Sequence, residues 1–142
     1  MTAEQATRDE LTLTVGHEGD VAHVIASVMR FCSEHNHDSV FAAHVATASS
    51  ELANNLWMHT PDGGQIRLRW LETGLRRGVE LRADDRGPGI PDLSLAMTEG
   101  YSTGGGMGCG LPGVERLMDD FDIRSQPGSG TQVVTHKWLR RR

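Results

Sequence analysis

Apolar side chains recur along this chain with two different periods, and each period predicts one type of secondary structure. Leu11, Leu13 and Val15 are apolar at every second position, which is typical of a short strand with one buried side. From about residue 19 to residue 35, apolar positions instead recur every three or four residues, as on one side of an amphipathic helix. These positions are Val21, Val24, Ile25, Val28 and Cys32. A polar N-terminal tail is expected before both elements.

A second helix is predicted from Ser39 to about His59. Asp38 stands where a carboxylate can accept hydrogen bonds from the first N–H groups of a helix. The segment is rich in alanine, and its apolar stripe consists of Val45, Ala48, Leu52 and Leu56. The sequence PDGG at residues 61–64 then ends the helix and turns the chain.

Two further pairs of alternating segments predict two antiparallel strand pairs. QIRLRWLE (65–72) and GVELRAD (78–84) are separated by TGLRR and form the first pair. FDIRSQ (121–126) and GTQVVTHKWL (130–139) flank the turn signal PGSG and form the second.

Short helices are expected between these two strand pairs, and they complete the order of elements. They lie over DLSLAMTE (92–99) and LPGVERLMDD (111–120), with Pro112 in the first turn of the latter, where a missing N–H is harmless. Strands that mostly neighbour each other, with helices grouped between them, predict an α+β two-layer sandwich. We expect a mixed, mainly antiparallel sheet with helices on one face.

Length and charge narrow the class of protein. Residues 1–142 fit one domain, with a structured core over about 10–139 and an arginine-rich C-terminal tail. With 14 basic and 19 acidic residues, the formal charge of −5 argues against nucleic acid or a membrane as partner. No apolar run is long enough to span a membrane, and the start lacks the apolar core of a signal peptide. A cytoplasmic protein with free thiols at Cys32 and Cys109 is expected.

The first chemical motif is SSELANNLWMH on the second predicted helix. Glu51 and Asn55 are spaced i to i+4, so their side chains stand about one turn apart on the same face. They border the apolar stripe, where an unpaired carboxylate would be costly. One interpretation is a solvated helix face. The other is a site in which the amide oxygen binds Mg²⁺ and the carboxylate acts on a hydroxyl.

The second motif is DRGPGIPD, which follows the strand ending in Asp84. Asp85 can accept a hydrogen bond in a pocket where Gly87 and Gly89 allow a flat ligand to approach the backbone. Asp84 is adjacent and competes for this assignment. A simple turn rich in turn-forming residues is the alternative interpretation.

The third motif is the glycine-dense stretch GYSTGGGMGCGLPG. Gly108, Gly110 and Gly113 formally match G-x-G-x-x-G, but no predicted strand leads into them, so the dinucleotide-binding fingerprint lacks its context. A P-loop is excluded because the chain contains no G-K-[ST]. What remains is a glycine loop that leads into a helix start, where free N–H groups favour phosphate, or else a surface loop.

In this order, the three motifs resemble the GHKL ATP-binding superfamily, whose Bergerat fold is shared by histidine kinases, gyrase B and anti-sigma-factor kinases. SSELANN resembles its N box, DRGPGI its first glycine box, TGGGMGCGL its second glycine box with the adjoining ATP lid, and GSGTQV the segment that follows. The resemblance covers about residues 10–139 and is strongest to the RsbT-type switch-protein serine/threonine kinases. It implies a histidine-kinase-like ATPase fold.

The resemblance also implies roles for individual residues. Glu51 would polarise the attacking hydroxyl, and Asn55 would bind the Mg²⁺ of Mg-ATP. Asp85 would accept a hydrogen bond from the adenine amino group, with Thr131 assisting. The pocket would be shaped by Gly87 and Gly89, and the phosphates would meet the backbone N–H groups of Gly104, Gly106, Gly108 and Gly110. Residues 100–105 would form the lid and residues 106–110 the phosphate cradle.

Three features depart from this pattern or compete with it. Lys137 is the only lysine and lies far from the glycine loop, so Mg²⁺, backbone dipoles or an arginine must neutralise the phosphates. Cys109 lies inside the loop, where we expect a plain small residue rather than a redox centre. His35 and His37 are close in sequence, but no further ligand stands at a metal-binding spacing.

The leading hypothesis is a stand-alone protein serine/threonine kinase. By resemblance, it would transfer the γ-phosphate of ATP to a STAS-domain antagonist or scaffold protein in a stressosome-type stress-response pathway. After release from that partner, it would activate a metal-dependent protein phosphatase. An anti-sigma factor with kinase activity is one alternative, and an ATP-dependent binding module with little catalysis is another. A sensor histidine kinase is not expected, because the chain has no room for the hairpin that carries the phospho-accepting histidine.

Overall fold

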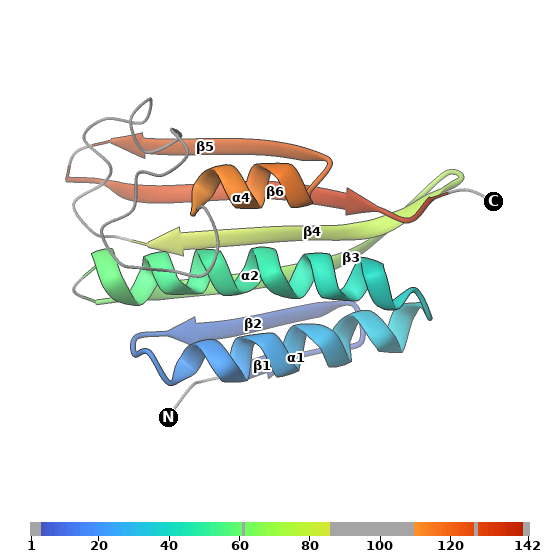
Figure 1. The fold of residues 1–142 in the computed structure, drawn as a ribbon, viewed down its shortest axis with the longest axis horizontal. Helices are drawn as coiled ribbons and strands as arrows, with labels where there is room; N and C mark the ends of the chain where they lie inside the picture. Colours follow the sequence, from blue (N-terminus) through green and yellow to red (C-terminus); the bar gives the residue numbers. More distant parts are fainter. Residues whose placement is uncertain (1–3, 61, 86–109, 127, 141–142) are drawn as a thin grey trace.

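One antiparallel sheet, covered by helices on one face, forms the body of the protein (Figure 1). The computed structural model describes residues 4–60, 62–85, 110–126 and 128–140. The strands are β1 (Glu4–Ala6), β2 (Glu10–Val15), β3 (Gly64–Thr73), β4 (Arg76–Asp85), β5 (Asp120–Gln126) and β6 (Gly130–Trp138). The helices are α1 (Asp20–His35), α2 (Ser39–His59) and α4 (Leu111–Leu117).

The strand order across the sheet is β1-β2-β3-β4-β6-β5. Each neighbouring pair is antiparallel, so the described part of the sheet contains no parallel pair. The α+β two-layer sandwich expected from the sequence is confirmed. Within the described residues, no helix has the length and apolarity needed to cross a membrane.

The helix predictions hold well because their start signals are local. The Asp38 carboxylate accepts hydrogen bonds from the backbone N–H groups of Val40 and Phe41, each at 3.0 Å, and α2 begins at the next residue. The predicted stripe of α2 is buried throughout, at Val45, Ala48, Leu52 and Leu56. α1 differs in one respect: Ile25 is 40% exposed, and Ser27 and Phe31 are buried in its place.

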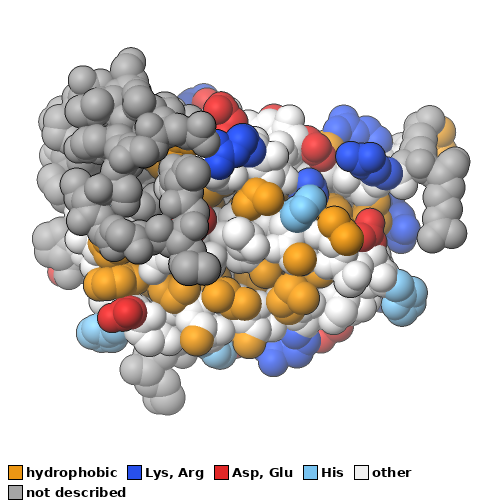
Figure 2. Space-filling model, viewed as in Figure 1, with side chains coloured by type: hydrophobic (Ala, Val, Ile, Leu, Met, Phe, Trp, Pro, Cys, Tyr) orange, Lys and Arg blue, Asp and Glu red, His pale blue; other side chains and the backbone are white. Residues whose placement is uncertain are grey.

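The exposed Ile25 shows that the buried face of α1 is rotated relative to the expected one. The helix buries positions 24, 27, 28, 31 and 32, because Phe31 offers a larger apolar surface than Ile25 or Val21. On the outer side of the helix layer, hydrophobic side chains gather over the helices (Figure 2). Ile25, Met29 and Val40 are exposed in this layer.

The strands differ from the sequence predictions in two places. The expected polar tail contains β1, which extends the sheet beside β2 and brings the Glu4 carboxylate within 3.0 Å of His23 Nε2. β3 and β4 continue through TGLRR until Thr73 pairs with Arg76. The turn is therefore only Gly74 and Leu75, and Gly74 adopts a φ of 61°, which glycine tolerates best. The sequence TGLRR lacks the alternation of apolar and polar residues that is typical of a strand, so the continuation of β3 and β4 was not predicted.

The last helix ends earlier than expected. α4 stops at Leu117, because the backbone N–H of Asp119 donates to the His136 carbonyl at 2.8 Å and Asp120 already pairs with β6. The helix expected over residues 92–99 lies outside the described residues.

The uncovered face of the sheet is polar, and one row of side chains crosses it with alternating charge. In strand order, its members are Glu10, Arg69, Glu80, His136 and Asp120. Arg69 Nη2 lies 3.4 Å from Glu80 Oε2, and the two His136 ring nitrogens lie 3.1 Å from Glu80 Oε2 and 2.9 Å from Asp120 Oδ1. This side of the sheet therefore faces solvent, and the core lies between the other face and the helices.

Cys32 lies fully buried in that core, on the inner side of α1. Burial raises the pKa of its thiol from 9.0 to about 12, because the thiolate would lose its hydration. In the unfolded chain the thiol ionises near its ordinary pKa, so between these values the folded state binds more protons. Stability must therefore fall as the pH rises above the unfolded pKa.

We expect this burial to be measurable as a pH dependence of stability. Between pH 8 and pH 10, the free energy of unfolding should fall by about 1 kcal/mol more than in a Cys32→Val variant. Urea unfolding of both proteins, each carrying Cys109→Ser so that only one thiol differs, measures this. Equal pH dependence in the two proteins would show that Cys32 ionises as readily in the folded state as in the unfolded one.

Candidate functional site

The polar residues singled out in the sequence collect at one end of the sandwich. β4 and β5 end there, β6 begins there, and the C-terminal end of α2, which packs against β3 and β4, lies at the same end of the molecule (Figure 1). Asp85 is the last residue of β4, and Thr131 is the second residue of β6. Asn55 lies near the C-terminus of α2, and Gly110 directly precedes α4.

Glu51 and Asn55 lie one turn apart on α2, at the border between core and surface. The Glu51 side chain belongs to the buried residues, with 6% exposure, whereas Asn55 is half-buried. The solvated-face interpretation therefore does not describe Glu51. A carboxylate inside a helix layer is uncommon, because burial disfavours its charged form.

The two adjacent asparagines of α2 have different surroundings. The Trp57 indole Nε1–H donates a hydrogen bond to Asn54 Oδ1 at 2.9 Å, so the Asn54 side chain fixes the orientation of the Trp57 ring on α2. No hydrogen bond to the Asn55 amide is found across the described ranges. Its Oδ1 is a neutral oxygen donor of the kind that Mg²⁺ accepts.

Asp85, Thr131 and Ser125 form a hydrogen-bonded group across three neighbouring strands. The Thr131 backbone N–H donates to Asp85 Oδ1 at 3.3 Å, which ties β6 to the end of β4. The hydroxyls of Thr131 and Ser125 lie 2.8 Å apart, because these residues are direct partners in the β5–β6 ladder. A carboxylate and two hydroxyls thus lie side by side.

Strand alternation separates Asp85 from Asp84. Asp84 points to the uncovered face, where its Oδ1 accepts a hydrogen bond from Gln132 Nε2 at 2.9 Å. Asp85 follows the buried Ala83 by two residues and therefore shares the helix-covered face. Only Asp85 lies on the same side of the sheet as α2.

Ser125 was not predicted from the sequence as a site residue. A signal for it exists, since the PGSG turn places FDIRSQ opposite GTQVV, and that pairing puts Ser125 across from Thr131. Strand pairing, rather than a motif, carries this information.

Of the glycine-dense stretch, the structure describes Gly110 and Gly113, and Gly113 is buried inside α4. Gly110 has a φ of 64°, a left-handed conformation that favours glycine, and its carbonyl accepts the hydrogen bond of Val114 N–H at 3.2 Å. Gly87, Gly89, Gly104, Gly106 and Gly108 lie outside the described residues, as does Cys109. Lys137 Nζ donates to the Leu117 carbonyl at 2.7 Å, so the single lysine is engaged at the C-terminal end of α4.

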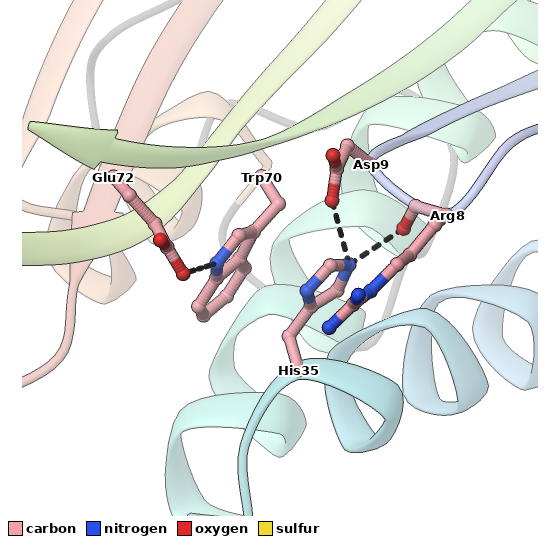
Figure 3. A pocket seen from close by; sticks show the side chains of 5 residues that line it. All are labelled: Arg8, Asp9, His35, Trp70 and Glu72. Atoms are coloured by element: carbon pink, nitrogen blue, oxygen red, sulfur yellow. Dashed lines mark hydrogen bonds and ion pairs between the residues drawn. The ribbon is translucent and has the colours of Figure 1, made fainter.

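A hollow of about 320 Å³ lies away from these residues, near the C-terminal end of α1 (Figure 3). It is lined by Arg8, Asp9, His35, Trp70 and Glu72. The His35 ring stacks on Trp70 with centroids 4.6 Å apart, and its Nε2–H donates to the Arg8 carbonyl at 2.6 Å. Gly64 pairs with Asp85, and Trp70 lies six positions further along β3. Six steps along a strand correspond to about 20 Å. The stacked rings pack the far end of the core.

The first end brings together a carboxylate, a hydroxyl and an amide oxygen, which could hold an amino-bearing ring and a metal ion. A carboxylate accepts from an amino group, a hydroxyl can pair with a neighbouring ring nitrogen, and an amide oxygen can hold Mg²⁺. The fit rests on Asp85, Thr131 and Asn55, which three different elements bring to one end.

The chain also matches known proteins in sequence and in fold. Residues 42–141 match the family of histidine kinase-, DNA gyrase B- and HSP90-like ATPases. The chain is 45% identical over 102 residues to the serine/threonine-protein kinase RsbT of Bacillus subtilis (strain 168), covering 72% of this chain and 76% of the relative. It is 29% identical to an anti-sigma F factor of Thermoanaerobacter sp. (strain X514), covering 68% of this chain and 70% of the relative.

Among solved structures, the mycobacterial sensor histidine kinase MprB is similar in fold. The TM-score is 0.51 at 23% identity, over 70% of this chain and 72% of that one. The match over residues 42–141 and the 45% identity to RsbT confirm the family resemblance drawn from the three sequence motifs. This chain belongs to the family of histidine kinase-, DNA gyrase B- and HSP90-like ATPases.

Proposed function

We propose that this protein is a cytoplasmic, single-domain serine/threonine kinase that phosphorylates a STAS-domain antagonist or scaffold protein. One observation carries the proposal: a buried carboxylate, Glu51, lies one helical turn from Asn55 on the helix that packs against β3 and β4, and Asp85 at the end of β4 is hydrogen-bonded to Thr131. The 45% identity to a serine/threonine-protein kinase supports the same chemistry. By this proposal, the pathway is a stressosome-type partner switch.

Each described site residue has a task in this proposal. Asp85 accepts a hydrogen bond from the adenine amino group, and the Thr131 hydroxyl lies next to it. Asn55 holds the Mg²⁺ that accompanies ATP, and this ion supplies positive charge for the phosphates. The backbone at Gly110, together with Gly104, Gly106 and Gly108, approaches the phosphates, while Gly87 and Gly89 shape the adenine pocket.

Glu51 orients and polarises the serine or threonine hydroxyl of the partner. Phosphoryl transfer requires positioning and charge stabilisation more than covalent chemistry, so one fixed carboxylate at the acceptor is sufficient. The rigid setting of Glu51 suits this task, because a buried helix residue next to Leu52 has little freedom to move. Release from the STAS protein would then allow the kinase to activate a metal-dependent phosphatase.

The similarity to anti-sigma F factors favours a second candidate. In that case the same kinase would also sequester a sigma subunit. Co-purification of a sigma factor would favour this candidate, whereas efficient STAS phosphorylation without sigma binding would exclude it. If ATP binds but no phosphate is transferred to any STAS partner, the protein is a nucleotide-dependent binding module.

The role of Glu51 predicts a separation of binding from transfer. In Glu51→Gln, phosphate transfer from ATP to a STAS-domain protein encoded nearby should fall at least about 100-fold, because the positioned base is lost. ATP affinity should stay within about threefold. Radiolabel transfer and calorimetry measure the two quantities. Glu34→Gln, an exposed carboxylate on α1, is the matched control and should transfer phosphate normally. Full activity of Glu51→Gln would remove Glu51 from catalysis.

The opposite orientations of the two aspartates predict a second difference. Asp85→Asn should weaken ATP binding at least about tenfold, because an amide replaces the charged acceptor beside Thr131. Asp84→Asn should bind ATP as the wild type does, since its side chain lies on the other face with Gln132. Calorimetric titration of both variants with Mg-ATP tests this pair. Equal losses, or a larger loss in Asp84→Asn, would contradict the assignment.

A further inference from the structure

The uncovered face of the sheet carries one row of side chains whose charges are not balanced. Arg67 on β3 and Arg82 on β4 are direct partners in the ladder, and Thr12 on β2 pairs with Arg67 from the other side. All three lie on this face, because the residues that flank them in their strands are buried in the core. We call Thr12, Arg67 and Arg82 the donor row, since each side chain can donate hydrogen bonds.

The two neighbouring rows of this face have their carboxylates engaged. In the row towards the β3–β4 turn, Arg69 pairs with Glu80, whose carboxylate also contacts His136. In the row towards the end of β4, Asp84 Oδ1 accepts a hydrogen bond from Gln132 Nε2. The two carboxylates that flank the donor row along β4 therefore already have partners.

The two arginines of the donor row have no such partner. Within the ranges that the structure describes, neither guanidinium forms an ion pair, and the hydrogen bond of Arg67 goes to Gln65 Oε1, at 3.1 Å from Nη2. Residues directly opposite each other have Cβ atoms about 5 Å apart, and like charges in such positions destabilise the strand pair. The donor row thus places two uncompensated cations side by side.

Arg82 shows a second sign of a missing acceptor. Its Nε is buried and has no hydrogen-bond partner, which is true of no other buried side-chain nitrogen or oxygen in the described part of the chain. Its partner on β6, Val134, has no acceptor in its side chain. A guanidinium that meets an oxyanion side-on donates from Nε and one Nη together. An anion beside Arg82 would therefore supply the acceptor, once the half-buried side chain turns that edge outward.

We propose that the donor row is an oxyanion site that binds a phosphate group between Arg67 and Arg82, with the Thr12 hydroxyl as a third donor. Phosphate fits because its oxygens accept from two guanidinium groups at once and its charge removes the repulsion between them. Free phosphate and a phosphate ester share this chemistry. The site lies on the face of the sheet opposite to α2, so it is separate from the candidate nucleotide site and independent of the proposed kinase activity.

NMR signals of the arginine side chains test this site residue by residue. The Nε–H signals of Arg67 and Arg82 are followed in two titrations, one with inorganic phosphate and one with O-phospho-L-serine, at an ionic strength held constant with sodium chloride. Both signals should shift saturably, with a Kd in the low millimolar range for at least one probe. The probe that binds more tightly identifies the source of the phosphate group, free or esterified.

Glutamine variants separate binding from folding. Arg82→Gln should weaken phosphate binding, measured at the Arg67 signal, at least about tenfold. In phosphate-free chloride buffer it should melt no lower than the wild type, because it removes the repulsion across the ladder. Arg67→Gln, measured at the Arg82 signal, is the reciprocal variant and should show the same loss. Arg124→Gln is the matched control: Arg124 lies on the same face, but its Nε is 3.3 Å from Asp122 Oδ2, so phosphate binding should not change.

Three results would overturn the oxyanion site. The first is a set of shifts that chloride alone reproduces, and the second is a wild-type Kd in both Arg82→Gln and Arg67→Gln. The third is a clear loss of stability of Arg82→Gln in chloride buffer, which would show that contacts within the protein compensate the Arg82 charge. None of these results bears on the kinase proposal, which ATP binding and phosphate transfer test separately.

Discussion

The packing of α2 across the central strands is the contact on which the candidate site depends. Leu52 and Leu56 of α2 belong to the same buried cluster as the inward residues of β3 and β4. Gly64 shows how close this contact is: a Cβ there would lie 2.2 Å from the Asp84 carbonyl oxygen and 2.7 Å from Leu56 Cδ2. Any side chain at this position would push the end of α2 away from the end of β4, and with it Asn55 away from Asp85.

Strand alternation then decides which polar residues face the helix layer. One step along β4 separates Asp85, on the side of α2, from Asp84, which bonds to Gln132 on the uncovered face. Asp84 pairs with Gln132, so the neighbouring Thr131 lies on the same face as Asp85. Ser125 lies on that face too, because it pairs with Thr131. The uncovered face has its own polar contacts, including the pair of Glu80 and His136. The uncovered face of the sheet thus meets solvent, and the helix-covered face carries the residues of the candidate site.

Local sequence signals predicted most of the fold, whereas features that depend on the pairing of distant strands were not predicted. Asp38 fixed the start of α2, because its capping bonds involve only the next few residues. β1 was missed, since its three residues are too few to show a pattern of their own and gain their structure only by pairing with β2. For the same reason, Ser125 escaped notice: its place beside Thr131 is a product of register, whereas Glu51 and Asn55 share a face through helical spacing alone.

Amide hydrogen exchange with and without Mg-ATP tests most directly the central claim, that nucleotide is held near the C-terminal ends of α2 and β4 and the start of β6. We expect slower exchange in the C-terminal half of α2, at the end of β4 and at the Thr131 amide, with no change around His35 and Trp70. Slowing confined to the hollow at His35 and Trp70, or no slowing at saturating Mg-ATP, would contradict this account.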